Sequence, residues 1–190
     1  MAKAVNPAHQ NWRWPQFWRN LFLYFWCFSF IGHIAEIFWA LFGNWVGFRE
    51  TPASTIPLFA IAVPYGFGAV LLLLVLYPRV KKKQINLVVA FVLGALITTI
   101  IELICSLSLV VFMGSNPFWD YSGRFLNLYG HVCLMNSIMF GLGAVVMLKW
   151  VFPWTERILV RIRARYVNVF FWILFVGYIL SQIDVRFLGR

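Results

Sequence analysis

Residues 85–114 read INLVVAFVLGALITTIIELICSLSLVVFMG, and this stretch decides the fold class. It contains a single charged side chain, Glu102, and it exceeds the ~20 apolar residues that a helix needs to cross a bilayer. Its apolar residues form a continuous run instead of alternating with polar ones, which favours a helix over a barrel strand. The stretch is therefore predicted to be a transmembrane helix, long enough to tilt or to extend past the bilayer.

Four further segments have the same character, and the composition of the whole chain agrees with them. The predicted spans are residues 21–43, 56–77, 85–114, 131–150 and 167–183. Of the 190 residues, 62% are hydrophobic and 12% are charged, whereas soluble domains average about 45–50% apolar and about 25% charged residues. We therefore expect an all-α, polytopic transmembrane helix bundle that forms a single membrane domain, residues 1–190.

The basic residues lie between these apolar segments, and the net charge of the chain is +10. On one side of the predicted bundle lie Lys3, Arg13, Arg19, Arg79, Lys81, Lys82, Lys83, Lys149, Arg157, Arg161, Arg163 and Arg165. Because cytoplasmic connections are rich in Lys and Arg, we expect a multi-pass protein of the bacterial cytoplasmic (inner) membrane, with the N-terminus in the cytoplasm and the C-terminus outside. The charge thus indicates the lipid bilayer as partner and no nucleic acid. Residues 154–166 are predicted to form a basic interfacial helix on the cytoplasmic side.

Two of the spans carry an acidic side chain. Glu36 follows His33 by three residues, so the two share a helix face. Glu102 belongs to a row of small and polar residues with a period of four: Ala90, Gly94, Thr98, Glu102 and Ser106. A charge at the bilayer centre costs about 2.5–3.5 kcal/mol on insertion scales, so each Glu needs compensation. Either both are protonated and hydrogen-bonded within packed helices, or they share a proton or a cation.

The second span contains the sequence Pro64-Tyr65-Gly66-Phe67-Gly68. Proline removes a backbone donor and glycine relaxes the backbone, so the sequence predicts a kink. The alternative is a broken helix whose free carbonyl groups line a cavity.

Polar residues are concentrated after the third span, in the outer polar loop 115–130 and at the start of the fourth span. This stretch contains Asn116, Pro117, Asp120, Tyr121, Arg124, Asn127, His131, Cys133 and Asn136. Asn-Pro and Ser-Gly pairs mark turns. Asp120 could form an ion pair with Arg124 or cap a short helix. Because polar residues continue into the span, we expect a re-entrant or capping segment that closes a central polar cavity.

These observations define a set of candidate substrate- or ion-binding residues. They are His33, Glu36, Tyr65, Glu102, Asp120, Tyr121, Arg124, Asn127, His131, Cys133 and Asn136. His131 and Cys133 are two residues apart and point to different faces of a helix, so a nucleophilic pair is disfavoured. No strong ligand spacing is present, so we expect no metal site and no cofactor, although a haem between His33 and His131 is conceivable.

The same residues carry a resemblance to a known family. The chain is similar to the small bacterial membrane permeases of the CmpB-like family, described as ABC transporters of type IV. The matching pieces are Gly32 with Glu36, the motif 64–68, Glu102, Trp119-Asp120-Tyr121-Ser122, and a block from Asn127 to Gly141. The resemblance runs from about Tyr24 to Pro153 and implies a transport function.

Two positions depart from the family pattern. This chain has His33 where a Trp commonly follows the first-span Gly, and His131 where an Arg commonly follows the fourth-span Gly. A titratable group thus replaces a fixed cation, which favours a pH-sensitive member or one with a different ligand.

Taken with the resemblance, the residues predict a transport or permease component with a buried polar cavity for a small substrate or ion. The chain contains no G-x-x-x-x-G-K-[ST] loop, so we expect a separate ATPase, and a second membrane subunit or a homo-oligomer is compatible with the sequence. Two alternatives stay open. One is an intramembrane enzyme acting on a lipid or isoprenoid substrate through Asp120, Tyr121, Asn127 and Cys133. The other is a non-catalytic subunit for substrate capture or assembly.

Overall fold

A computed structural model of the chain describes residues 15–46, 62–116 and 118–187, and within them it is mainly helical. The elements are α1 (Pro15–Val46), α2 (Val63–Leu71), the π-helical turn η3 (Leu72–Leu76), α3 (Tyr77–Lys81), α4 (Leu87–Met113), β1 (Asn127–Leu128), β2 (Val132–Cys133), α5 (Leu134–Val146), the π-helical turn η4 (Met147–Val151), α6 (Phe152–Arg161) and α7 (Ala164–Phe187). The predicted all-α class is confirmed, with a two-residue antiparallel strand pair as a small addition.

The described part of the chain contains four helical stretches that are long and apolar enough to cross a membrane. They are Pro15–Phe38, Val63–Lys81, Leu87–Met113 and Leu134–Leu159. Large apolar side chains are exposed along them, such as Val88, Ile104 and Val111 of α4, as expected for helices that face lipid. The start of α7 adds a shorter apolar helix, Ala164–Gly177, so a fifth span over residues 167–183 stays a prediction.

The helix boundaries differ from the sequence-based ones at two places. Residues 134–161 form one uninterrupted helical stretch through η4, and residues 154–166 are divided between α6 and the start of α7. In the region of the span predicted at residues 56–77, the observed helix α2 begins at Val63. Residues 56–61 of the predicted span lie outside the described residues. Pro64 therefore stands in the first turn, where a helix needs no N–H donor, and the kink predicted at this proline was wrong.

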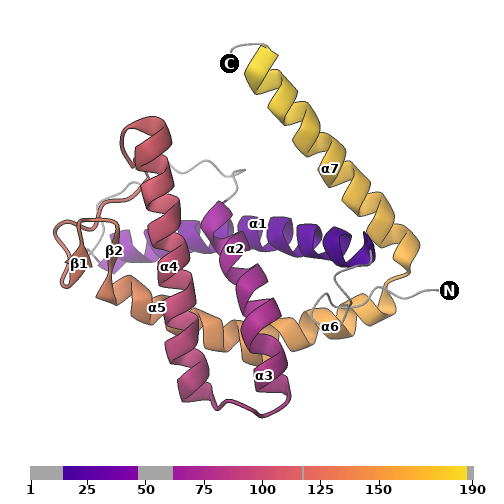
Figure 1. Cartoon of the computed structure of the whole chain (residues 1–190), viewed down its shortest axis with the longest axis horizontal. Helices are drawn as coiled ribbons and strands as arrows, with labels where there is room; N and C mark the ends of the chain where they lie inside the picture. Colours follow the sequence, from indigo (N-terminus) through magenta and orange to yellow (C-terminus); the bar gives the residue numbers. More distant parts are fainter. Residues whose placement is uncertain (1–14, 47–61, 117, 188–190) are drawn as a thin grey trace. The chain divides into compact units, whose positions relative to one another are not determined.

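Residues 24–152 form a compact unit in which small residues allow helices to approach closely. Figure 1 shows α5 crossing α4, and an ideal Cβ on Gly94 of α4 would lie 2.4 Å from Ala144 Cβ of α5. A Cβ on Gly66 of α2 would lie 2.1 Å from the Oγ atom of Ser29 in α1. These two glycines allow backbone approaches that any larger residue would prevent.

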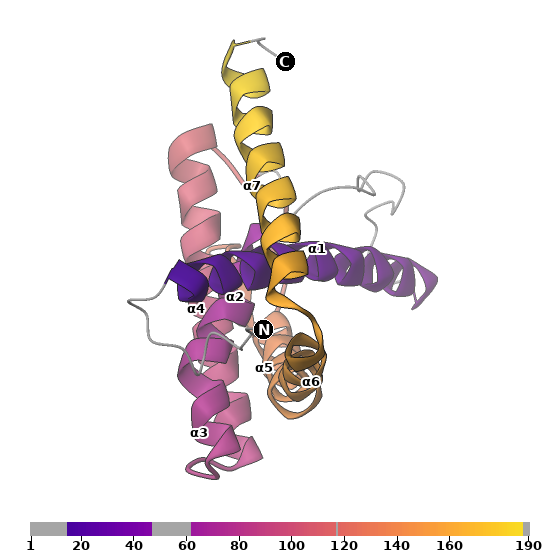
Figure 2. The same ribbon diagram turned by 90° about the vertical axis from the view of Figure 1, so that its right-hand side faces the viewer.

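A short turn joins α3 to α4 within this unit. Figures 1 and 2 show α2, η3 and α3 running beside α4, to which they are joined by the turn at residues 82–86. The Asn86 side chain caps α4 by accepting a hydrogen bond from Val89 N at 2.9 Å. Gly114, with φ at +79°, ends α4 in a left-handed conformation that glycine adopts without strain.

The described residues of a second unit run from Pro15 to Leu23 and from Pro153 to Phe187. Its core consists of Leu23 and Val167, with Leu159, Ile162, Phe171 and Leu174 packed around them. Arg19 donates hydrogen bonds to the side chains of Asn20 and Asn168. This unit contains none of the candidate binding residues.

Candidate functional site

The first candidate pair joins α1 to α2. Tyr65 donates its hydroxyl hydrogen to Glu36 Oε2 over 2.5 Å, and both side chains are half-buried. Gly32, one turn before Glu36, makes room for the tyrosine, since a Cβ there would lie 2.3 Å from Tyr65 Cβ. Ala62 N donates to Ser29 O at 3.2 Å and holds the start of α2 against α1. Gly32 and Glu36 of α1 and Tyr65 of α2 therefore all take part in one contact between these two helices.

The second pair joins α4 to the loop after it and to α5. Tyr121 donates to Glu102 Oε1 over 3.0 Å, and Asn136 Nδ2 donates to the same tyrosine hydroxyl. Glu102 is only 5% exposed. Among the described residues its second oxygen, Oε2, has no hydrogen-bond partner, although it is buried. A buried carboxyl oxygen without a donor is costly, which leaves room for a proton, a water molecule or a ligand at this atom.

Tyr121 also relates the two pairs to each other. Burial raises the pKa of Tyr121 well above its usual range, and the charges of Glu102 and Glu36 raise it further. Both carboxyl groups thus act on one phenol, although they come from different helices. We call Glu36, Tyr65, Glu102, Tyr121 and Asn136 the carboxyl–phenol cluster.

A second group of hydrogen bonds lies one turn further along α4. The Ser106 hydroxyl is fully buried and lies 2.8 Å from His131 Nδ1, and Asn116 Nδ2 donates to it over 2.8 Å. Trp119 Nε1 donates to His131 O over 3.1 Å. The side chain of Asn116 therefore attaches the loop to α4, and that of Trp119 attaches it to His131, three residues before α5 begins.

Two of the remaining candidate residues, Asp120 and Asn127, shape the loop itself. Asp120 Oδ1 accepts hydrogen bonds from the backbone N–H, at 2.9 Å, and the hydroxyl of Ser122, and these bonds lower the pKa of Asp120. Asn127 Nδ2 donates to Ser122 O and Arg124 O, and its Oδ1 accepts from Gly130 N. The tight turn requires glycine at position 130, where φ is +78° and a Cβ would lie 2.6 Å from Asp120 Oδ1.

The other candidates occupy different environments. His33 is buried on α1 near Glu36, and Cys133 is a buried free thiol in β2. The Arg124 side chain is exposed. Within the described residues, no three His, Cys, Asp or Glu side chains gather closely enough to hold a metal ion.

Several residues of these contacts were absent from the sequence-based site. Ser106 belongs to the row of residues with a period of four that contains Glu102, so its position one helical turn after Glu102 could be predicted from the sequence. The sequence indicates Asn116 only as a turn residue and Trp119 only as part of the family motif, because their contacts with Ser106 and His131 depend on how the loop folds back. Thr99 donates to Ser137 over 2.8 Å and adds a further polar contact between α4 and α5.

Comparison with known proteins gives one result. No curated protein and no solved structure matches the chain. The profile of the CmpB-type family, described as "Putative ABC-transporter type IV", matches residues 23–184. This range includes three of the four membrane-length helical stretches in full and the first of them from Leu23 onward, together with the loop that carries Tyr121. The resemblance is thereby confirmed, and the chain belongs to this family.

Proposed function

We propose that this chain is the membrane permease component of a transporter and that the carboxyl–phenol cluster binds a small substrate or ion. Family membership supports the transport role. The observation that carries the site is the hydrogen bond between Tyr121, outside the spans, and Glu102, within the third span. Energy would come from a separate ATPase, because the chain carries no phosphate-binding loop of the ATPase type.

The chemistry of the cluster favours a ligand that donates hydrogen bonds or carries positive charge. Its polar atoms are two carboxyl groups, two phenols and one amide, and they come from α1, α2, α4, α5 and the outer loop. Glu102 Oε2 still lacks a donor among the described residues. A proton, an ammonium group or a small cation would satisfy that oxygen and offset the cost of a carboxylate inside the membrane.

The outer loop would then act as the cover of the site. Tyr121 reaches Glu102 from the loop, and Asn116 and Trp119 attach the same loop to Ser106 and His131. Breaking these few hydrogen bonds would expose Glu102 without unfolding any helix. Movements of this size in loops occur in microseconds to milliseconds and commonly admit ligands.

The first experiment tests the partner. The tagged full chain is extracted from its native membrane in mild detergent, and co-purified proteins are identified by mass spectrometry and assayed for ATP hydrolysis. We expect an ATPase to accompany the chain in a fixed ratio. Isolation of the chain alone from several detergents and from lipid nanodiscs would contradict the proposed dependence on an ATPase.

The second experiment tests the site. A panel of protonated amines, monovalent cations and neutral small molecules is screened for stabilisation of the purified chain against thermal unfolding. A compound that stabilises the wild type should lose its effect in Glu102→Gln, which removes the negative charge and preserves the shape. Ser108→Ala is the matched control in the same helix, because the Ser108 hydroxyl, within the part of the chain that the structure describes, bonds only its own helix at Ile104 O. Equal stabilisation of the wild type and Glu102→Gln would exclude Glu102 from the binding site.

A further inference from the structure

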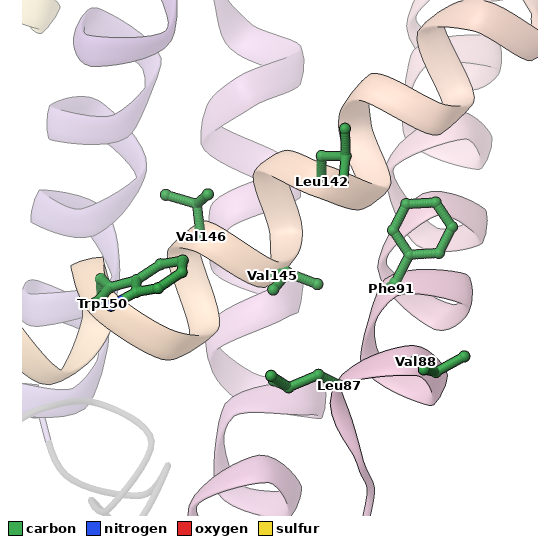
Figure 3. Close-up of a pocket in the computed structure, with 7 residues that line it drawn as sticks. All are labelled: Leu87, Val88, Phe91, Leu142, Val145, Val146 and Trp150. Atoms are coloured by element: carbon green, nitrogen blue, oxygen red, sulfur yellow. The ribbon is translucent and has the colours of Figure 1, made fainter.

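A shallow apolar groove lies away from the carboxyl–phenol cluster. Its volume is about 440 Å³, and its lining residues are Leu87, Val88, Phe91, Leu142, Val145, Val146 and Trp150. Figure 3 shows these side chains, which come from the beginning of α4, from α5 and from η4. The volume falls within the roughly 300–1,000 Å³ of typical small-ligand sites, and the lining contains no charged side chain.

The end of the groove at Trp150 carries a positive charge. Lys149 Nζ lies 4.8 Å from the centroid of the Trp150 ring, and both residues belong to η4. The tryptophan thus forms part of the apolar wall and also holds the ammonium group over its ring. Lysine and tryptophan together are typical of the headgroup layer, where an apolar body meets charged phosphates.

The turn before α4 adds further positive charge in the sequence. The turn that leads into α4 contains Lys82 and Lys83, and neither residues 79–92 nor residues 140–152 include an acidic side chain. Leu87 and Val88, which line the groove, form the first turn of α4. Although the Asn86 side chain already accepts from Val89 N, the helix dipole still favours a negative group at this end of α4.

We propose that this groove is a binding site for one anionic phospholipid of the bilayer. An acyl chain would lie along the apolar wall, and the Lys149 ammonium group would bind the headgroup phosphate. The charge selects an anionic lipid over a zwitterionic one, because Lys149 lies beside the groove, Lys82 and Lys83 precede α4 in the sequence, and residues 79–92 and 140–152 contain no acidic side chain. The site does not depend on the proposed transport function.

The test compares lipids that differ only in their headgroup. The purified full chain is incubated with phosphatidylglycerol or phosphatidylcholine of identical acyl chains, and bound lipid is counted by native mass spectrometry. Lys149→Gln should lower phosphatidylglycerol occupancy about fivefold, as expected for one charge at a membrane surface, and lower phosphatidylcholine occupancy clearly less, because the choline cation offsets the charge of the phosphate. Lys149→Arg should restore the binding, and Lys82→Gln should have a smaller effect than Lys149→Gln.

A second pair of variants tests the groove and keeps the charge. Val88→Trp fills the groove and should lower the occupancy of both lipids. Val111→Trp is the matched control, since it adds the same bulk to an exposed valine about 35 Å further along α4. The proposal is overturned if Lys149→Gln and Lys82→Gln have equal effects, if Val88→Trp and Val111→Trp have equal effects, or if a co-purified protein subunit covers the groove.

Discussion

The clearest prediction concerns the hydroxyl group of Tyr121. Tyr121→Phe removes one oxygen that donates to Glu102 Oε1 over 3.0 Å and accepts from Asn136 Nδ2. Glu102 would then lose its hydrogen bond at Oε1, while its Oε2 has no partner among the described residues. A hydrogen bond to a charged group is worth about 1.5–3 kcal/mol, and an unpaired buried group costs about 1–3 kcal/mol. We expect the free energy of unfolding to fall by about 2–4 kcal/mol, a range below the simple sum because the two effects overlap.

The assay is equilibrium unfolding of the purified chain in mixed micelles, followed by helical circular dichroism. Tyr129→Phe is the matched control in the same loop, because Tyr129 is 90% exposed and its change should stay within about 0.5 kcal/mol. Asn136→Ala combined with Tyr121→Phe should cost less than the sum of the single changes, since both remove the same contact. The reasoning is refuted if Tyr121→Phe destabilises no more than Tyr129→Phe.

Three further predictions concern the loop and the helix crossings. Ser106→Ala should lower the free energy of unfolding by about 1–3 kcal/mol, because it leaves two half-buried partners, His131 and Asn116, unpaired, and Ser108→Ala should be nearly neutral in the same unfolding assay. Gly94→Ala should lower the free energy of unfolding by about 1–3 kcal/mol, since the new Cβ would lie 2.4 Å from the methyl group of Ala144. The control is Gly143→Ala, where a Cβ would meet no described atom within 4 Å, and this variant should be stabilised. Equal destabilisation of both variants would contradict this account. The hydrogen bonds from Ser122 lower the pKa of Asp120, so the ionised carboxylate should stabilise the loop at neutral pH, and this contribution should disappear as the pH falls through the lowered folded pKa. Protease protection of the loop should therefore differ between wild type and Asp120→Asn at neutral pH and converge in acid, and a constant difference would be inconsistent with this origin.

The sequence predicted the fold class because the bilayer constrains the chain so strongly. Backbone groups inside lipid must be satisfied within the segment, so the apolar run at residues 85–114 had to be a helix, and the structure places α4 at Leu87–Met113. The small-residue row was also readable, since Ala90, Gly94, Glu102 and Ser106 are among the buried residues of α4. A period of four residues marks one helix face whatever the helix packs against.

Boundaries depended on features that hydrophobicity does not report. Pro64 lies in the first turn of α2 instead of forming a kink, because the helix begins at Val63. The fourth predicted span continues through η4 into α6, since Trp150 and Pro153 do not end the helix. Aromatic and basic residues predict where a helix meets the membrane surface, but they do not terminate it.

The composition of the candidate site shows what sequence alone could determine. That Glu36 and Glu102 require partners followed from the cost of a carboxylate in the bilayer, and this holds for any packing of the helices. Which partners they take was decided only by the tertiary structure. Tyr65 reaches Glu36 because Gly32 leaves space for it, and Tyr121 reaches Glu102 because the outer loop folds back. Contacts between residues 19 or 29 positions apart depend on how helices cross, and no local pattern contains that information.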